Sequence, residues 1–284
     1  MPTQLNFARL KQIFYQIGDP LVRRVRFNGV LKKNHDQTAD EELLRRARKH
    51  VPVFVFQMGK VASTSIYKSL QTHYEGPVFH AHSFEPFHGS PEIRALHRYH
   101  QAQNPIKIIS LIREPVTRNI SAFFQNFKRD TGRTIEESNL SAIELKRMFL
   151  NNYPHEIPLV WFDNNIQKHF GIDVYSRPFP QSGHDTFSQD GIELLVMRHD
   201  LDDSVKETLV QDFAGLQDFC LESENVGAEK RYAELYELLK QVKLPLKHLH
   251  YLASSKYMHH FFKDDMREIL CTWSDEPLES RKTG

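Results

Sequence analysis

The chain has 284 residues, 40% of them hydrophobic, and a formal net charge of +1 at pH 7. This length can bury one large core or two small ones. The balanced charge argues against bulk binding to a polyanion, so no nucleic acid partner is expected. With two cysteines there is no disulfide framework, which favours a reducing compartment such as the cytoplasm. No apolar stretch approaches the roughly 20 residues that a membrane-spanning helix needs.

The first residues are strongly basic. Residues 1–33 hold seven Lys or Arg and one acid, Asp19, and apolar residues recur at helical spacing over 5–17. We therefore expect residues 1–50 to form a basic helical N-terminal arm. Two interpretations of residues 1–33 stay open: a peripheral contact with a membrane surface or a partner, or a solvated helix packed on the domain.

Residues 51–284 are expected to form a single α/β domain. Its expected strands are 53–57, 77–84, 106–112 and 193–198; the runs at 53–57 and 106–112 are apolar without polar alternation, and 77–84 runs into a loop. Helices are expected between and after them, at 64–73, 91–103, 115–128, 136–151, 158–170, 203–213, 229–241, 246–252 and 254–271. Strands without a polar/apolar alternation, separated along the chain by helices, indicate a parallel sheet with helices on both faces. A helix-rich C-terminal half is expected to follow this sheet.

The stretch QMGKVASTSI, residues 57–66, has the features of a loop that binds an anion. It places Lys60 in a turn after a strand, and Ser63, Thr64 and Ser65 at a helix start. The first N–H groups of a helix have no internal partner, and the helix dipole favours negative charge there. We expect one of the three hydroxyls to cap the helix. The stretch lacks the late, glycine-flanked lysine of a Walker A loop. An ordinary capped helix with a surface lysine is the alternative.

The stretch SLIREPVTRNISAFF provides a second anion site. Arg113 stands at a strand end, Ser121 lies eight positions later in the next helix, and Arg118 lies between them. An Arg at the carboxyl end of a strand and a Ser two turns into the next helix can converge on one anion. The alternative is that Arg113 pairs with Glu114 or another surface acid and that Ser121 is merely buried.

Together the two stretches resemble the nucleotide-binding elements of sulfotransferases that use 3′-phosphoadenosine 5′-phosphosulfate. QMGKVASTSI resembles the 5′-phosphosulfate loop, in the K-x-x-S-T-S form typical of carbohydrate sulfotransferases, and REPVTRNIS resembles the R-x-P-x-x-R-x-x-S element for the 3′-phosphate. WFDNNIQKHFGIDVY, ELLVMRHDLDD and SKYMHHFFKDDMREI are similar to bacterial-type sulfotransferases assigned to capsular polysaccharide synthesis. The resemblance spans about residues 50–275.

The resemblance implies a P-loop-like sheet, a 3′-phosphoadenosine 5′-phosphosulfate donor and a saccharide or polysaccharide acceptor. It implies that Lys60 contacts the 5′-phosphate and the sulfuryl group, and that Arg113 and Ser121 bind the 3′-phosphate. The implied phosphate cradle consists of Ala62, Ser63, Thr64 and Ser65. One departure is Ile66, which stands where cytosolic small-molecule sulfotransferases carry a tryptophan, so adenine stacking at this position is not expected.

A general base is expected after the second strand. In VFHAHSF, His80 and His82 point to the same side of an extended chain, and histidine suits proton abstraction near neutral pH. The stretch resembles the H-x-H segment of heparan sulfate 2-O-sulfotransferases, which implies His82 as the base and His80 as its support. Open alternatives are a zinc pair, a purely structural role, and Glu85 as the base.

The expected function is in-line sulfuryl transfer to a saccharide hydroxyl. No metal is expected, because a lysine and helix dipoles supply the positive field. One rival is an ATP-dependent P-loop kinase, which needs a Walker lysine, a following Ser/Thr and a strand-end Asp. The other rival is a non-catalytic module of the same fold that binds a nucleotide or a glycan.

Overall fold

The structure is a computed structural model and describes residues 29–85, 89–222 and 243–275. The predicted helices 5–17 and 229–241 and the first 28 residues of the basic arm lie outside the described residues. Within the described ranges, no helix combines the length and apolar character that crossing a membrane requires.

A five-stranded sheet forms the centre of the domain, in the order β2-β1-β3-β5-β4. Strands β1 (Val53–Phe56), β2 (Val78–Ala81), β3 (Ile106–Ile112) and β5 (Ile192–Arg198) are parallel to their neighbours. Strand β4 (His184–Gln189) pairs antiparallel with β5 at the edge. The predicted α/β fold is confirmed, with a sheet that is mostly rather than wholly parallel.

The central strands are apolar because helices cover them. Every side chain of β1 is buried, as are all those of β3 except Lys107. The connecting helices are α3 (Ser63–His73), α4 (Pro91–Gln101) and α5 (Pro115–Thr131). Each enters from the carboxyl end of a parallel strand, so the chain turns there three times. The predicted site residues lie in or next to these turns, except Ser121, which lies inside α5.

The edge strand β4 was not predicted. Its sequence, HDTFSQ, is polar and mostly half-buried or exposed, so it lacks the apolar run of the other strands. Asp190 and Gly191 join it to β5 with φ values of 48° and 78°. Positive φ at both residues of an Asp-Gly pair is typical of a two-residue hairpin turn. The sequence feature that indicates this strand is therefore the Asp-Gly turn that follows it, and not the pattern of the strand residues.

The C-terminal half is helical, as predicted, with two predicted helices divided. Asn139, with φ 51°, ends α6 (Ile135–Ser138) before α7 (Ala142–Asn152), and residues 262–265 separate α13 (Lys256–Phe261) from α14 (Met266–Trp273). The remaining helical elements are α8 (Ile157–Phe162), the π-helical turn Asp163–Gln167, α9 (Lys168–Phe170), α10 (Asp203–Ala214) and α12 (Leu246–Ala253).

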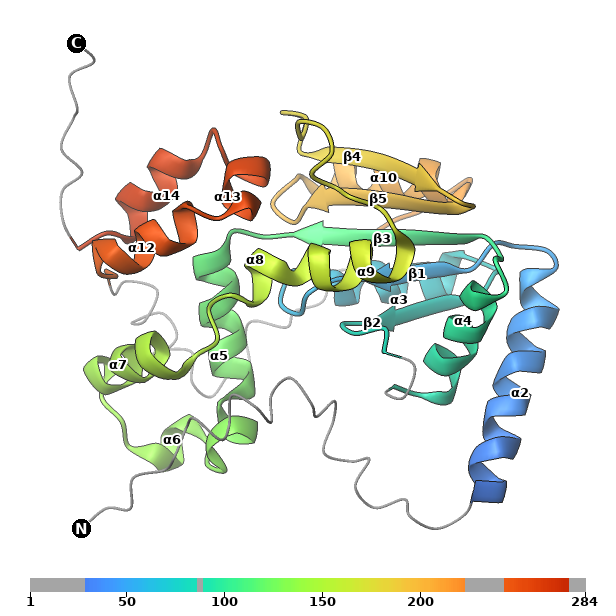
Figure 1. The fold of residues 1–284 in the computed structure, drawn as a ribbon, viewed down its shortest axis with the longest axis horizontal. Helices are drawn as coiled ribbons and strands as arrows, with labels where there is room; N and C mark the ends of the chain where they lie inside the picture. The colour runs from blue at the N-terminus through green and yellow to red at the C-terminus, as the bar shows by residue number, and fades with distance from the viewer. Residues whose placement is uncertain (1–28, 86–88, 223–242, 276–284) are drawn as a thin grey trace.

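Helices lie along the sheet and also at both ends of its strands (Figure 1). Helix α5 runs away from the carboxyl end of β3, and α12, α13 and α14 lie beside the same end. At the other side of the domain α2 (Gly29–Ala47) lies along α4. Two ion pairs join these helices, Arg94 with Asp36 and Arg98 with Asp40. The last part of the predicted arm is thus packed on the domain.

Candidate functional site

The loop after β1 has a strained backbone. Lys60 has φ 73° and Ala62 has φ 62°, both in the left-handed region. Residues other than glycine adopt this backbone region at a cost of roughly 1–2 kcal/mol per residue. Five non-glycine residues have positive φ in the described part of the chain, and two of them lie within this short turn. Strain of this kind concentrates at functional sites, where the surrounding structure holds it in place.

Helix α3 begins without a side-chain cap, which corrects the prediction that a hydroxyl caps it. Ala62 occupies the cap position, so Ser63, Thr64 and Ser65 form the first helical turn. The Ser65 hydroxyl donates to the carbonyl of Ala62 (3.3 Å), and the Ser63 Oγ lies 3.1 Å from His80 Nε2. Uncapped N–H groups at this helix start remain suited to an external acceptor.

The second anion element meets the loop directly. Arg113 follows β3, and one terminal nitrogen of its guanidinium donates to the Lys60 carbonyl (3.1 Å), while its Nε donates to Thr117 Oγ1 (3.2 Å). Because β1 and β3 are neighbours, their carboxyl ends bring the two motifs together. Glu114 does not bond to Arg113; its carboxylate accepts the N–H groups at the start of α5, including that of Thr117 (2.8 Å).

Ser121 is buried on α5, two turns beyond Arg113. No hydrogen bond joins their side chains within the described ranges. The two residues share the element that follows β3, and Arg113 is the one that reaches the Lys60 loop.

The two histidines lie together beside this loop, with ring centroids 5.0 Å apart. His82 Nδ1 lies 2.9 Å from the carbonyl oxygen of Gln57. A carbonyl can only accept, so Nδ1 carries the proton and Nε2 is left as the acceptor. That nitrogen faces the loop: a Cβ built on Gly59 would lie 3.6 Å from it. His82 thus presents an unprotonated ring nitrogen to the loop.

The surroundings keep both rings neutral. Burial is the main cause that lowers the pKa of His82; the positive charges of Arg118 and Lys60 lower it further, and the hydrogen bond to Gln57 opposes them. Burial, followed by the neighbouring His82, lowers the pKa of His80 to about 4. A neutral His82 can accept a proton at pH 7, and His80 is tied to Ser63, which fits a supporting role.

Two of the three alternatives to His82 as the base are a zinc pair and Glu85. No group of three or more His, Cys, Asp or Glu side chains suited to a metal ion occurs among the residues that the structure describes. Glu85, the other candidate base, forms an ion pair with Lys168 Nζ, and its carboxylate also lies 3.6 Å from His169 Nε2. Glu85 is thus paired with Lys168 of α9, whereas His82 faces the loop.

Three residues that hold the site together were not among the predicted catalytic or nucleotide-binding residues. Arg118 is buried and donates to the Gly59 carbonyl (2.9 Å) and to the Tyr153 hydroxyl (2.8 Å). The hydroxyl of the fully buried Tyr257 donates to the Arg113 carbonyl (2.9 Å) and accepts from the Arg113 N–H (3.2 Å). Arg118 was visible within the second motif, but no local pattern marks either tyrosine.

Comparison with known proteins gives one match. Residues 126–263 match the model of a family described as "Putative capsular polysaccharide synthesis protein". No curated protein and no solved structure matches the chain. The match supports a family related to capsular polysaccharides. It begins after both anion elements and includes Tyr153 and Tyr257.

Proposed function

We propose that this protein is a sulfotransferase that moves a sulfuryl group from 3′-phosphoadenosine 5′-phosphosulfate to a hydroxyl of a saccharide acceptor. The observation that carries the proposal is the junction of its two anion elements. Arg113 donates to the carbonyl of Lys60, and His82 stands against the same turn with an acceptor nitrogen facing it. A ligand with two separate anionic groups fits such a junction better than one with a single chain of phosphates.

The donor would lie across the carboxyl ends of β1 and β3. Its 5′-phosphosulfate would take the N–H groups of the first turn of α3, with the Lys60 ammonium beside it. The cradle would consist of Ala62, Ser63, Thr64 and Ser65. The 3′-phosphate would take the free end of the Arg113 fork and the Ser121 hydroxyl. The inherent strain at Lys60 and Ala62 supports this role, because it keeps the turn open for an anion.

The reaction is an in-line displacement at sulfur. The acceptor oxygen forms a bond to sulfur as the bond from sulfur to the bridging oxygen breaks, and that electron pair stays on the 5′-phosphate. The acceptor proton passes to His82 Nε2. Lys60 and the start of α3 stabilise the negative charge that grows on the leaving oxygen. The products are a sulfated saccharide and adenosine 3′,5′-bisphosphate, and no step calls for a metal.

The saccharide acceptor rests on the family match, whose description concerns capsular polysaccharide synthesis. A glycan hydroxyl has a pKa far above 7, so a positioned base is needed to remove its proton as it attacks. His82 supplies that base in this proposal.

The test combines binding with transfer. In calorimetry the protein is expected to prefer adenosine 3′,5′-bisphosphate over adenosine 5′-monophosphate and over ATP with magnesium. Labelled sulfate is then expected to move from the donor to one member of a panel of capsular polysaccharides. A preference for ATP with magnesium would favour the kinase. Tight bisphosphate binding without transfer to any acceptor would favour a nucleotide-binding module.

A further inference from the structure

Arg118 is a buried cation with neutral partners. Its side chain is 5% exposed, and its guanidinium donates to the Gly59 carbonyl, the Tyr153 hydroxyl and Asn119 Oδ1. No carboxylate pairs with it in the described ranges. Burying an unpaired charge is costly, and this cost is offset only in part by hydrogen bonds to neutral groups. A role beyond stability would account for such a residue here.

The hydrogen bond to Gly59 connects Arg118 to the turn that carries Lys60. Arg118 Nε holds the carbonyl of Gly59 (2.9 Å), and Arg113 holds the next carbonyl along the chain, that of Lys60 (3.1 Å). Gly59 is also the residue that lies against His82 Nε2. Two arginines therefore fix two consecutive carbonyls, and the first of these belongs to the residue that lies against His82.

The guanidinium of Arg118 is itself held in place. One terminal nitrogen donates both to Tyr153, which follows α7, and to Asn119 Oδ1 (3.0 Å). The amide of Asn119 donates in turn to the carbonyl of His155 (3.1 Å). A side chain held from two elements is pre-organised, and a pre-organised supporting residue can fix a reacting geometry within a fraction of an ångström.

We propose that Arg118 is a positioning residue of this site: by holding the carbonyl of Gly59, it fixes the Gly59–Lys60 turn against Nε2 of His82. The kinetic part of this inference rests on the proposed function; the effect on His82 does not, because it concerns the protein without ligand.

The groups around His82 set the direction of the charge effect. Burial lowers the pKa of His82 most, Arg118 on α5 and Lys60 in the loop lower it further, and the Gln57 carbonyl at the end of β1 raises it. On the remaining sides lie His80 of β2, whose own pKa is lowered to about 4, and the indole N–H of Trp161 on α8, which donates to the His82 carbonyl. Loss of the Arg118 charge is therefore expected to raise the pKa of His82.

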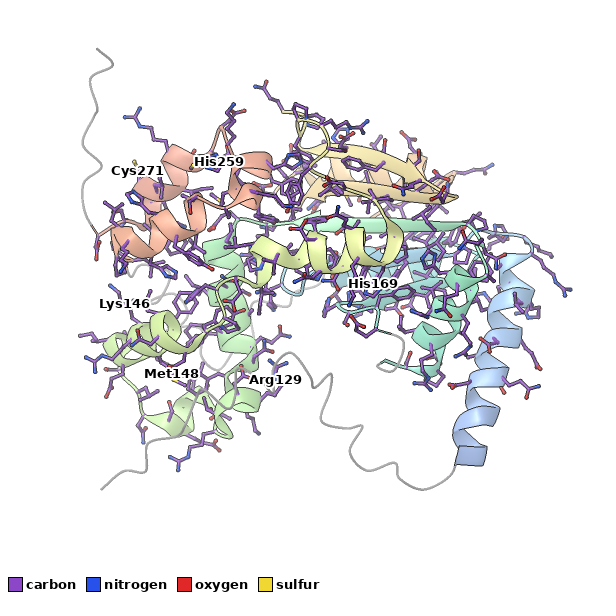
Figure 2. All side chains as sticks on the ribbon, in the orientation of Figure 1. Arg129, Lys146, Met148, His169, His259 and Cys271 are labelled. Atoms are coloured by element: carbon purple, nitrogen blue, oxygen red, sulfur yellow. The ribbon has the colours of Figure 1, made fainter. Side chains whose placement is uncertain are left out.

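The experiment compares Arg118→Met, which removes the charge, with Tyr153→Phe, which keeps the charge and removes the hydrogen bond between the guanidinium and the Tyr153 hydroxyl. Arg129→Met is the matched control, because Arg129 is an exposed arginine at the far end of the same helix (Figure 2). The His82 ring is titrated by NMR in the free protein, with His82→Gln to assign its signal, and kcat and KM are measured against pH.

Arg118→Met is expected to move the titration of His82, and with it the acid limb of kcat, to higher pH. It is also expected to lower kcat by about 10- to 100-fold, since a displacement of about 1 Å can cost that much. Tyr153→Phe is expected to lower kcat by a smaller factor without moving the titration. Arg129→Met is expected to change neither.

Arg118→Met with a lower stability but an unchanged His82 titration and unchanged kcat would overturn the inference. If this variant does not fold, Arg118→Lys serves instead: it keeps the charge and loses the fork, so kcat should fall while the titration stays. A wild-type kcat in Arg118→Lys would then count against the positioning role. If wild type transfers no sulfate at all, the proposed function fails, and the NMR titration alone still decides whether Arg118 controls His82.

Discussion

Removing the Arg113 guanidinium is the sharpest test of the donor. Arg113→Met keeps the stem of the side chain and removes its hydrogen bonds to Lys60 (3.1 Å) and Thr117 (3.2 Å). The backbone of residue 113 stays anchored, because Tyr257 bonds both its N–H and its carbonyl. The variant is therefore expected to fold, and any change in nucleotide binding reports on the guanidinium.

The expected loss follows from the type of contact. A charge-assisted hydrogen bond is worth about 1.5–3 kcal/mol, which corresponds to an affinity for adenosine 3′,5′-bisphosphate weaker by roughly 10- to 100-fold. Adenosine 5′-monophosphate lacks the 3′-phosphate, so its affinity should fall only through the lost support of the Lys60 carbonyl. Ser121→Ala should show the same selectivity to a smaller degree.

Calorimetric titration of both nucleotides against wild type, Arg113→Met, Ser121→Ala and the double variant provides the measurement. Thr117→Val is the control, because it removes one anchor of the guanidinium and keeps its charge; it should affect both nucleotides slightly and equally. An equal loss for both nucleotides in Arg113→Met would mean that Arg113 supports the loop and does not read the 3′-phosphate. A wild-type protein with no preference for the bisphosphate would refute the donor assignment itself.

Four further predictions concern the remaining parts of the site and the core. Lys60→Met should cost about 3 kcal/mol or more of transition-state stabilisation, seen as a fall in kcat, while Lys146→Met on α7 (Figure 2) leaves kcat as in wild type. His82→Gln should lower kcat by about 10²-fold or more with bisphosphate affinity nearly unchanged; an equal loss in affinity would make His82 a donor contact. Tyr257→Phe should lower the free energy of unfolding by about 1–3 kcal/mol, because it leaves buried groups of Arg113 unpaired, and should weaken the bisphosphate more than the monophosphate; urea titration and calorimetry measure the two effects. Burial, followed by the neighbouring His248, lowers the pKa of His155 to about 3 in the folded protein. When the pH falls below about 6.5, the ordinary pKa of histidine, the unfolded chain therefore binds a proton that the folded protein does not. Unfolding should therefore become easier as the pH falls, by about 2 kcal/mol between pH 7 and pH 5 from this ring alone. His155→Gln should remove that share of the pH dependence in urea titrations at the two pH values, and an unchanged dependence would contradict it.

The sequence predicted the fold correctly where the pattern of residues within an element matches the surroundings of that element in the folded protein. Strand β3 has the predicted bounds, Ile106–Ile112, because a continuous apolar run is stable only between two covered faces. Helix α5 starts with Pro115, whose fixed φ suits a first turn, and ends at Gly132 with φ 79°. The strand β4 was missed because its side chains are polar, although the Asp-Gly turn before β5 could have indicated it.

The start of α3 was predicted wrongly for a different reason. A local rule favours a serine or threonine at the cap, but the turn before the helix is shaped by contacts from elsewhere in the chain. Arg113 and Arg118 hold the carbonyls of Lys60 and Gly59 from 53 and 59 positions away. With those carbonyls fixed, Lys60 and Ala62 take positive φ, and the three hydroxyl residues follow inside the helix.

The same kind of long-range contact links the family match to the site. The matched segment, residues 126–263, contains neither anion element, yet it supplies two tyrosine hydroxyls to the second of them. Tyr153 holds the guanidinium of Arg118 across 35 positions, and Tyr257 holds the backbone of Arg113 across 144 positions. Both bonds fix groups that in turn fix the Lys60 turn or the end of β3. A small shift of either tyrosine moves an arginine that holds a carbonyl of the loop, so under the proposed function substitutions in the helical half are expected to change donor binding.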